Sequence, residues 1–204
     1  TDTFGYIRMG FGCAGTTYQT NKPFVFSMPQ VEIGSYATSY IPTSGSAATR
    51  SADVCNGSGT SAEFNDSEGV LFAEIEALFN DGTFRNISIS DGSSSDSIRM
   101  YYRPTANQLT MLVMSSSSQQ ALSTITLSDV LEFNKIAIKY KQNDFALWVN
   151  GVEVATDTSG NTPIGLSELA FDDGSGGYDF YGKVKQLIYF NEALSDSELQ
   201  TLTS

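Results

Sequence analysis

The chain has 204 residues, 40% of them hydrophobic and 12% aromatic, which is enough to build the core of one sizeable domain. Its 11 basic and 23 acidic residues give a formal net charge of −12, and such a field repels nucleic-acid phosphates. The absence of histidine excludes Ser-His-Asp and Cys-His catalysis and histidine-bound zinc. No stretch of sequence is apolar over the length needed for membrane insertion, and no signal peptide is visible.

Two short strands are predicted at the start of the chain, over residues 4–12 and 24–33, where apolar side chains fall at nearly alternate positions. A pair of strands is rarely stable alone in water. This N-terminal β annex is therefore expected to pack on the rest of the chain, on an upstream domain or on another chain. We assign residues 1–50 to the annex and its connector, and residues 51–204 to the main domain.

The connector is marked by Ile41-Pro42, since a residue that precedes proline is forced toward an extended conformation and cannot lie inside a helix. Cys13 and Cys55 lie on opposite sides of the assigned boundary. We interpret them as two small buried apolar side chains, and a disulfide that ties the annex to the main domain is the alternative.

From residue 62 onward, apolar strands alternate with polar turns in the pattern of an antiparallel sandwich. Asn150-Gly151 predicts a tight hairpin, because both central positions of such a turn need positive φ. Ser195 and Glu198 have the spacing of a capping box and predict a short helical turn at the end of the chain. Strands are predicted over residues 70–79, 84–90, 97–103, 108–115, 131–140, 145–149, 152–155, 166–171 and 183–190.

Several stretches resemble one family. They are residues 30–45 (QVEIGSYATSYIPTSG), the hairpin from 134 to 151, and residues 194–199 (LSDSEL). Together they resemble the concanavalin A-like, or laminin-G-like, jelly-roll domains of phage tail and virion proteins. The resemblance covers residues 30–204 and implies an all-β, concanavalin A-like jelly-roll sandwich preceded by the short β annex. It also implies a location in a virion or outside the cell, with the annex formed by the last strands of an upstream module.

The resemblance implies a non-catalytic module that binds carbohydrate or a receptor, with a cell-surface or extracellular glycan as its partner. Assembly into a homo-oligomer or with other virion proteins is expected as well. Sugar rings stack on flat aromatic side chains, while Arg99 and Arg103 could contact an acidic glycan or pair with surface carboxylates. Trp148 either faces the concave side of the sandwich or packs in a second core layer. The candidate ligand-binding residues are Tyr101, Tyr102, Arg103, Trp148, Tyr178 and Tyr181.

Two other functions stay open. One is a polysaccharide-cleaving glycoside hydrolase or lyase that uses Glu74 and Glu76. These residues occupy alternate positions of one strand, as the catalytic carboxylates do in polysaccharide hydrolases that share this fold. The plainer interpretation of the pair is a solvent-facing row opposite a buried one. A structural decoration or oligomerisation module without a ligand is the remaining alternative. Binding without catalysis is the function we favour.

A calcium site is the last candidate. The acidic, glycine-rich loop around Asp172, Asp173 and Asp179 offers the carboxylate and carbonyl oxygens that Ca²⁺ prefers. A similar turn runs from residue 91 to 96. Asp-Gly is also ordinary turn chemistry, so both loops have an explanation that needs no metal.

Overall fold

The computed structural model describes residues 40–48 and 58–204 of the chain. The chain divides into two compact units, Thr1–Ala52 and Asp53–Ser204. In the first unit, residues 40–48 form neither helix nor strand and are almost entirely exposed. The strands predicted over 4–12 and 24–33, and both Cys13 and Cys55, lie outside the described residues.

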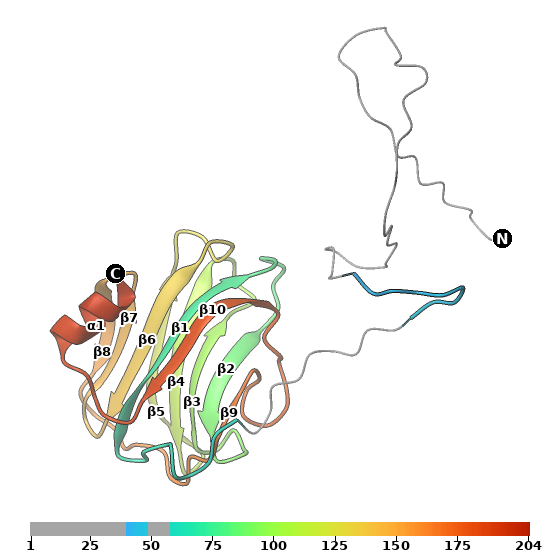
Figure 1. The fold of residues 1–204 in the computed structure, drawn as a ribbon. Coiled ribbons are helices and arrows are strands. Elements are labelled where there is room, and N and C mark those ends of the chain that lie inside the picture. Colours follow the sequence, from blue (N-terminus) through green and yellow to red (C-terminus); the bar gives the residue numbers. More distant parts are fainter. Residues whose placement is uncertain (1–39, 49–57) are drawn as a thin grey trace, which may run out of the picture. The chain divides into compact units, whose positions relative to one another are not determined.

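The second unit consists of two five-stranded sheets that form a sandwich, and every strand pairing within them is antiparallel (Figure 1). The all-β sandwich predicted from the sequence is therefore confirmed. The first sheet, which we call the helix-bearing sheet, has the order β10 (Gly182–Phe190), β1 (Glu68–Ala77), β6 (Asn134–Lys141), β7 (Phe145–Val149) and β8 (Val152–Asp157). The second sheet has the order β5 (Ser118–Thr126), β4 (Gln108–Ser115), β3 (Ser97–Tyr102), β2 (Arg85–Ser90) and β9 (Glu168–Ala170).

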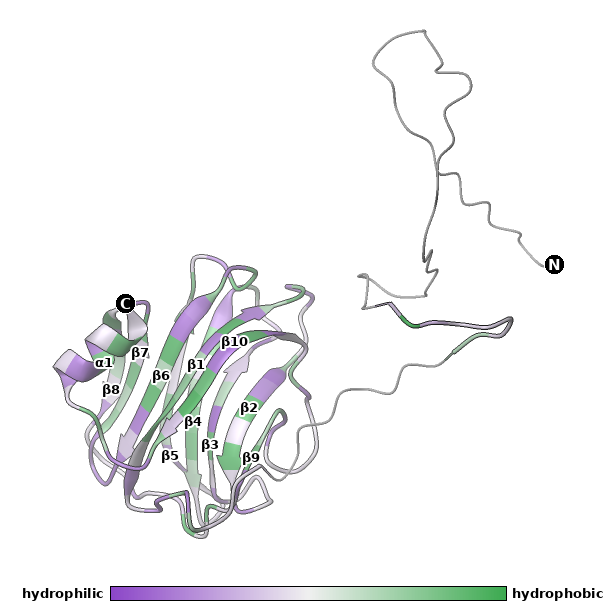
Figure 2. Ribbon diagram, viewed as in Figure 1, coloured by the Kyte–Doolittle hydropathy of each residue, from purple (hydrophilic) through white to green (hydrophobic). Residues whose placement is uncertain are grey.

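The core lies between the two sheets, because successive side chains of a strand face opposite sides and one set of each strand points inward. Strand β3 contributes the side chains of Ile98, Met100 and Tyr102 to this core, and each of them is at most 2% exposed. Figure 2 shows apolar residues recurring along the strands of both sheets, with hydrophilic residues between them. The opposite set of each strand is left to form the outer face of its sheet.

A second, smaller core covers part of the outer face of the helix-bearing sheet. The helix α1 (Asp196–Thr203) lies beside β6, β7 and β8 and places Leu199 on this face (Figure 1). Its start is the predicted capping box, in which the main-chain N–H of Ser195 donates to Glu198 at 2.8 Å. Among the described residues, no helix is long and apolar enough to cross a membrane. The second core consists of Val70, Phe72, Ala137, Ala146, Trp148 and Leu199.

Strand β5 is not predicted by the sequence pattern. Its residues, SQQALSTIT, are mostly polar, and they form an edge strand whose outward side chains are exposed. Only a few positions, such as Ala121, point into the core, so the apolar alternation that signals a strand is weak. The tight turn before β5 uses Ser116 and Ser117 at φ of 51° and 63°, an uncommon conformation for residues other than glycine.

Candidate ligand-binding face

The outer face of the second sheet carries the candidate site. In β3, the side chains of Arg99 and Tyr101 point outward because Ile98, Met100 and Tyr102 point inward. Strand pairing places Tyr101 opposite Asn86 of β2 on one side and opposite Thr110 of β4 on the other. The face therefore presents a row of polar and aromatic side chains that crosses the sheet.

The row continues to the edge strand. Thr110 lies opposite Thr124 of β5, and their hydroxyl oxygens are 2.8 Å apart. Arg103, which follows β3, donates from Nη1 to the hydroxyl of Thr124 at 3.3 Å. The predicted ligand residues Tyr101 and Arg103 thus share one face, with threonine hydroxyls between them.

The loop formed by residues 171–181 borders this face, and it is the orange connection between β9 and β10 in Figure 1. Its two ends meet, since the N–H of Phe180 donates to the carbonyl of Phe171 at 2.8 Å. The rings of these two residues lie 6.1 Å apart, and that of Phe180 is 6.3 Å from Tyr102 of the core. Near the tip, the N–H of Asp173 donates to the carbonyl of Gly177 at 2.9 Å, which closes the loop a second time.

An aromatic cluster stands where this loop meets the sheet. The ring of Phe84 lies 5.9 Å from that of Tyr101 and 5.4 Å from that of Tyr178. Tyr178 is 62% exposed and Phe84 is 36% exposed, so the cluster is open to solvent. We call Phe84, Tyr101 and Tyr178 the aromatic cluster below. Both tyrosines were predicted from the sequence, whereas Phe84 was not, because nothing in a strand pattern separates a core phenylalanine from one at the surface.

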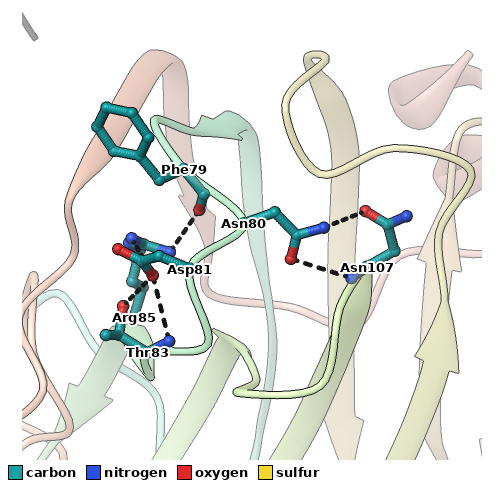
Figure 3. A network of polar contacts seen from close by, with 6 residues as sticks. All are labelled: Phe79, Asn80, Asp81, Thr83, Arg85 and Asn107. Carbon is teal, nitrogen blue, oxygen red and sulfur yellow. Dashed lines mark hydrogen bonds and ion pairs between the residues drawn. The ribbon is translucent and has the colours of Figure 1, made fainter. Parts of the chain in front are cut away.

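The turn that precedes β2, to which Phe84 belongs, is braced by a network of polar contacts (Figure 3). Asp81 accepts hydrogen bonds from the hydroxyl of Thr83 at 2.8 Å and from Nη2 of Arg85 at 2.8 Å, on either side of Phe84. These bonds, led by the one from Thr83, hold the pKa of Asp81 below its ordinary value. Arg85 also donates to the carbonyl of Phe79 at 2.7 Å.

A second contact fastens the same turn to its neighbour. Asn80 donates from Nδ2 to Oδ1 of Asn107, in the turn between β3 and β4, at 3.0 Å (Figure 3). The turn that carries Phe84 is therefore tied to the sheet by side chains from both of its ends.

Among the described arginines, Arg99 and Arg103 differ from Arg85 in having no ion pair, while Lys135, which has none either, donates to the main-chain oxygen of Ser204. Neither Arg99 nor Arg103 forms an ion pair within the described part of the chain, and the Nε of each is buried without a hydrogen-bond partner. Ser88, which lies opposite Arg99 on the same outer face, also has a buried hydroxyl without a partner. Ion pairs are instead formed by Arg85, Lys139, Lys141, Lys183 and Lys185.

The two arginines have different surroundings. Burial lowers the pKa of Arg99, and the nearby charge of Asp173 acts in the opposite direction without forming an ion pair. Arg103 is half-buried, and its guanidinium group donates to the hydroxyl of Thr124 while its main-chain N–H donates to the carbonyl of Gln108. Both guanidinium groups keep donors that are free to bind an anion.

Two predicted ligand residues do not belong to this face. Tyr102 points into the core, is 2% exposed, and donates to the carbonyl of Ile75 at 3.3 Å. Burial raises its pKa above the ordinary range. Trp148 is 6% exposed and lies on the other sheet beneath α1, which is the second-core position considered as the alternative. Both residues are corrected from ligand-binding to structural roles.

Tyr181 lies at the far end of the 171–181 loop, beside the start of β10. It is 52% exposed, and its hydroxyl is 3.5 Å from Asp179. Within the described residues, its ring contacts none of the rings of the aromatic cluster. Tyr181 is thus exposed as predicted, but it stands apart from the cluster.

Glu74 and Glu76 lie on the outer face of the helix-bearing sheet, on the opposite side of the core from the aromatic cluster. Each carboxylate pairs with a lysine of β10: Glu74 with Lys185 at 3.0 Å and Glu76 with Lys183. Glu76 is only 8% exposed. Glu74 and Glu76 do share one face, as predicted, and on that face they form cross-strand ion pairs.

Two of the carboxylates predicted to bind calcium accept hydrogen bonds from main-chain N–H groups of their own loop. Asp172 accepts from the N–H of Gly174 at 2.7 Å, and Asp173 accepts from the N–H groups of Ser175 and Gly177 at 3.0 and 3.1 Å. Burial would raise the pKa of Asp173, but the hydrogen bond from the hydroxyl of Ser175, the main-chain bonds and the charge of Arg99 hold it below its ordinary value. Within residues 40–48 and 58–204, no three acidic or cysteine side chains gather as metal ligands would. Calcium binding stays a prediction.

Residues 73–200 match the family model of the concanavalin A-like lectin/glucanases superfamily, and the chain belongs to this family. Its fold is similar to that of the CBM40 domain of Ruminococcus gnavus IT-sialidase, with a TM-score of 0.59 and 16% identity over 73% of this chain and 94% of that domain.

Two other solved structures are also similar. A leech intramolecular trans-sialidase gives a TM-score of 0.56 and 18% identity over 74% of this chain and 26% of that protein. A heptameric SAP-like pentraxin from Limulus polyphemus gives 0.55 and 12% over 73% and 74%. Among curated protein sequences, none matches this chain. These similarities confirm the predicted concanavalin A-like fold.

Proposed function

We propose that this protein is a carbohydrate-binding module whose outer face on the second sheet holds an acidic glycan. The observation that carries the proposal is the pair Arg99 and Arg103, which form no ion pair with any residue that the structure describes, although the chain has a net charge of −12. Free cations are unexpected on so acidic a protein, because surface carboxylates are abundant. An anionic ligand is the partner that would satisfy them.

The chemistry of the two arginines favours a carboxylate. A guanidinium group presents donors in a planar fork that matches a carboxylate, and such charge-assisted bonds are stronger than neutral ones. Arg99 and Arg103 are four residues apart along an extended strand, so their Cα atoms are separated by ~13 Å. That span suits a chain of several sugar units better than a single ring.

The aromatic cluster supplies the other part of the site. Sugar rings bury their apolar faces against flat side chains, and tyrosine adds a hydroxyl that can bond to the sugar. Tyr101 lies between the two arginines in the sequence and belongs to the cluster, so stacking and charge recognition can act on one ligand. The solved CBM40 domain of R. gnavus was obtained bound to α2,3- and α2,6-sialyllactose, which are acidic sugars, and this similarity of fold supports the same class of ligand.

An open face of this kind holds a sugar weakly in a single copy. Display of several copies on one particle raises the overall affinity without new contacts, since each further binding event becomes intramolecular. We therefore propose that the module acts as a homo-oligomer or on a larger assembly, such as a phage virion or tail, outside the cell. Light scattering of the whole chain tests the oligomer, and its mass should exceed that of one chain.

The test of ligand class compares two sugars that differ only in charge. We expect isothermal titration with 3′-sialyllactose to give measurable binding and titration with lactose to give much weaker binding. Arg99→Gln and Arg103→Gln should each weaken binding of the acidic sugar roughly tenfold or more, since each removes a charge-assisted bond. Lys141→Gln is the matched control, because Lys141 pairs with Glu68 on the helix-bearing sheet.

Equal binding of the two sugars would contradict the acidic-ligand proposal. A glycan array without any bound sugar would instead favour the ligand-free structural module. Release of new reducing ends from a polysaccharide, lost in Glu76→Gln, would favour the hydrolase.

A further inference from the structure

Asn86 makes an unusual pair of contacts beneath the aromatic cluster. It lies in β2 and is 3% exposed, so its side chain is almost entirely covered. Its main-chain N–H donates to the carbonyl of Tyr178 at 3.1 Å, and its side-chain Nδ2 donates to the same carbonyl at 3.2 Å. Two donors of one residue thus converge on one oxygen of the 171–181 loop.

The carbonyl of Tyr178 needs such an anchor because its residue has an unfavourable backbone. Tyr178 has a φ of +57°, in the left-handed region that side chains other than glycine and asparagine rarely adopt. A conformation of this kind costs on the order of 1 kcal/mol and persists only when the surroundings fix it. Near the loop tip, Gly174 and Gly176 also have positive φ, but as glycines they adopt it without strain.

The strained backbone determines where the ring of Tyr178 stands. The side chain is 62% exposed. Among the described residues, its ring contacts the ring of Phe84, with the centroids 5.4 Å apart. Its direction therefore comes from the main chain rather than from packing around the ring. If the carbonyl were released, Tyr178 could leave the left-handed region, and the ring would leave the cluster.

We infer that Asn86 is the positioning residue of the binding face: it holds Tyr178 in the conformation that completes the aromatic cluster, without touching the ligand itself. This inference rests on the proposed function, since the cluster is taken as the surface on which the sugar stacks. Asn86 would then contribute to ligand selection although it is buried, uncharged and not aromatic.

The test uses Asn86→Ala, which removes the Nδ2 donor and leaves the main-chain donor in place. The first measurement does not depend on a ligand: in the NMR spectrum of the wild type, nuclear Overhauser effects should join the rings of Tyr178 and Phe84. Asn86→Ala should weaken these signals strongly. Unchanged ring signals would overturn the inference, whatever the protein binds.

The second measurement is the affinity for 3′-sialyllactose. Asn86→Ala should raise the Kd about threefold to tenfold, the effect of one lost hydrogen bond on the bound geometry. In a Tyr178→Ala background the same change should have no further effect, because the ring that Asn86 positions is already gone. Equal effects in both backgrounds would overturn the inference, while absence of binding by the wild type would overturn only the proposed function.

Asn134→Ala is the matched control. Asn134 is 2% exposed, lies in β6 of the other sheet, and donates from Nδ2 to the carbonyls of Asp129 and Glu132 at 2.9 and 2.8 Å. Its loss should lower the melting temperature as much as that of Asn86 and leave the Kd unchanged. A similar rise of the Kd in Asn134→Ala would show that general destabilisation explains the result for Asn86, and would overturn the inference.

Discussion

Leu199→Ala should destabilise the protein without affecting the binding face. Leu199 is fully buried and joins α1 to the second core on the helix-bearing sheet. Replacing a buried leucine by alanine costs about 3 kcal/mol, because apolar contacts are lost and a cavity stays behind. Alanine is at least as good a helix former as leucine, so the loss does not come from helix propensity.

The expected shift follows from the size of the domain. For a domain of about 150 residues, 1 kcal/mol corresponds to roughly 2–4 °C, so the melting temperature should fall by roughly 6–12 °C. Circular dichroism on heating measures the fall. The emission of Trp148, which contributes to the same core, should shift to longer wavelength if α1 loosens.

Leu131→Ala is the control, because Leu131 is 43% exposed and its loss should change the melting temperature little. The affinity of Leu199→Ala for 3′-sialyllactose should equal that of the wild type at temperatures where both are folded. A fall of less than about 2 °C with unchanged emission would show that α1 does not pack on the sheet in solution. A loss of binding would show that the two outer faces are coupled.

Two further predictions concern the buried hydroxyls and the tight packing of the sandwich. Burial raises the pKa values of Tyr102 and Tyr140 above their ordinary range, so the folded state resists their ionisation. The stability they contribute is complete below the tyrosine value of about 10 and falls as the pH rises above it, which alkaline melting curves measure; a flat melting temperature up to about pH 11 would disprove this. In Gly69→Ala, the added Cβ would lie 2.7 Å from the carbonyl oxygen of Phe190 and 2.7 Å from the hydroxyl of Tyr140. We expect a loss of about 2 kcal/mol in urea unfolding, and an unchanged midpoint would refute the packing at this position.

The sandwich was predictable because its strands obey a period of two with well-marked turns. The Asn150-Gly151 turn was predicted from its residue types, and both residues have positive φ as expected. β5 was not predictable in the same way, since an edge strand with polar outward side chains offers few apolar positions to count. Where both faces of a sheet are buried, the alternation of apolar residues also does not reveal toward which face a side chain points.

That ambiguity explains the errors at the candidate site. Tyr101 and Tyr102 are consecutive, so one must point outward, but only the register with Ile98 and Met100 decides which. Trp148 has the correct parity for an outer face, and the sequence alone does not reveal that α1 covers that face. The role of Asn86 depends on contact with a residue far along the chain, and no local pattern encodes it.

The 171–181 loop is closed at its base by the bond between Phe180 and Phe171, and again near its tip by the bond between Asp173 and Gly177. The residues between these ends can be exchanged for a segment of different length without moving the strands on either side, provided that Phe171 and Phe180, which pack on the core, are kept. If the face binds a glycan as proposed, relatives with the same two sheets would acquire new sugar preferences by exchanging this part of the loop alone. For engineering, it is a natural place to graft foreign loops while Arg99 of β3 and Arg103, which follows it, stay where they are.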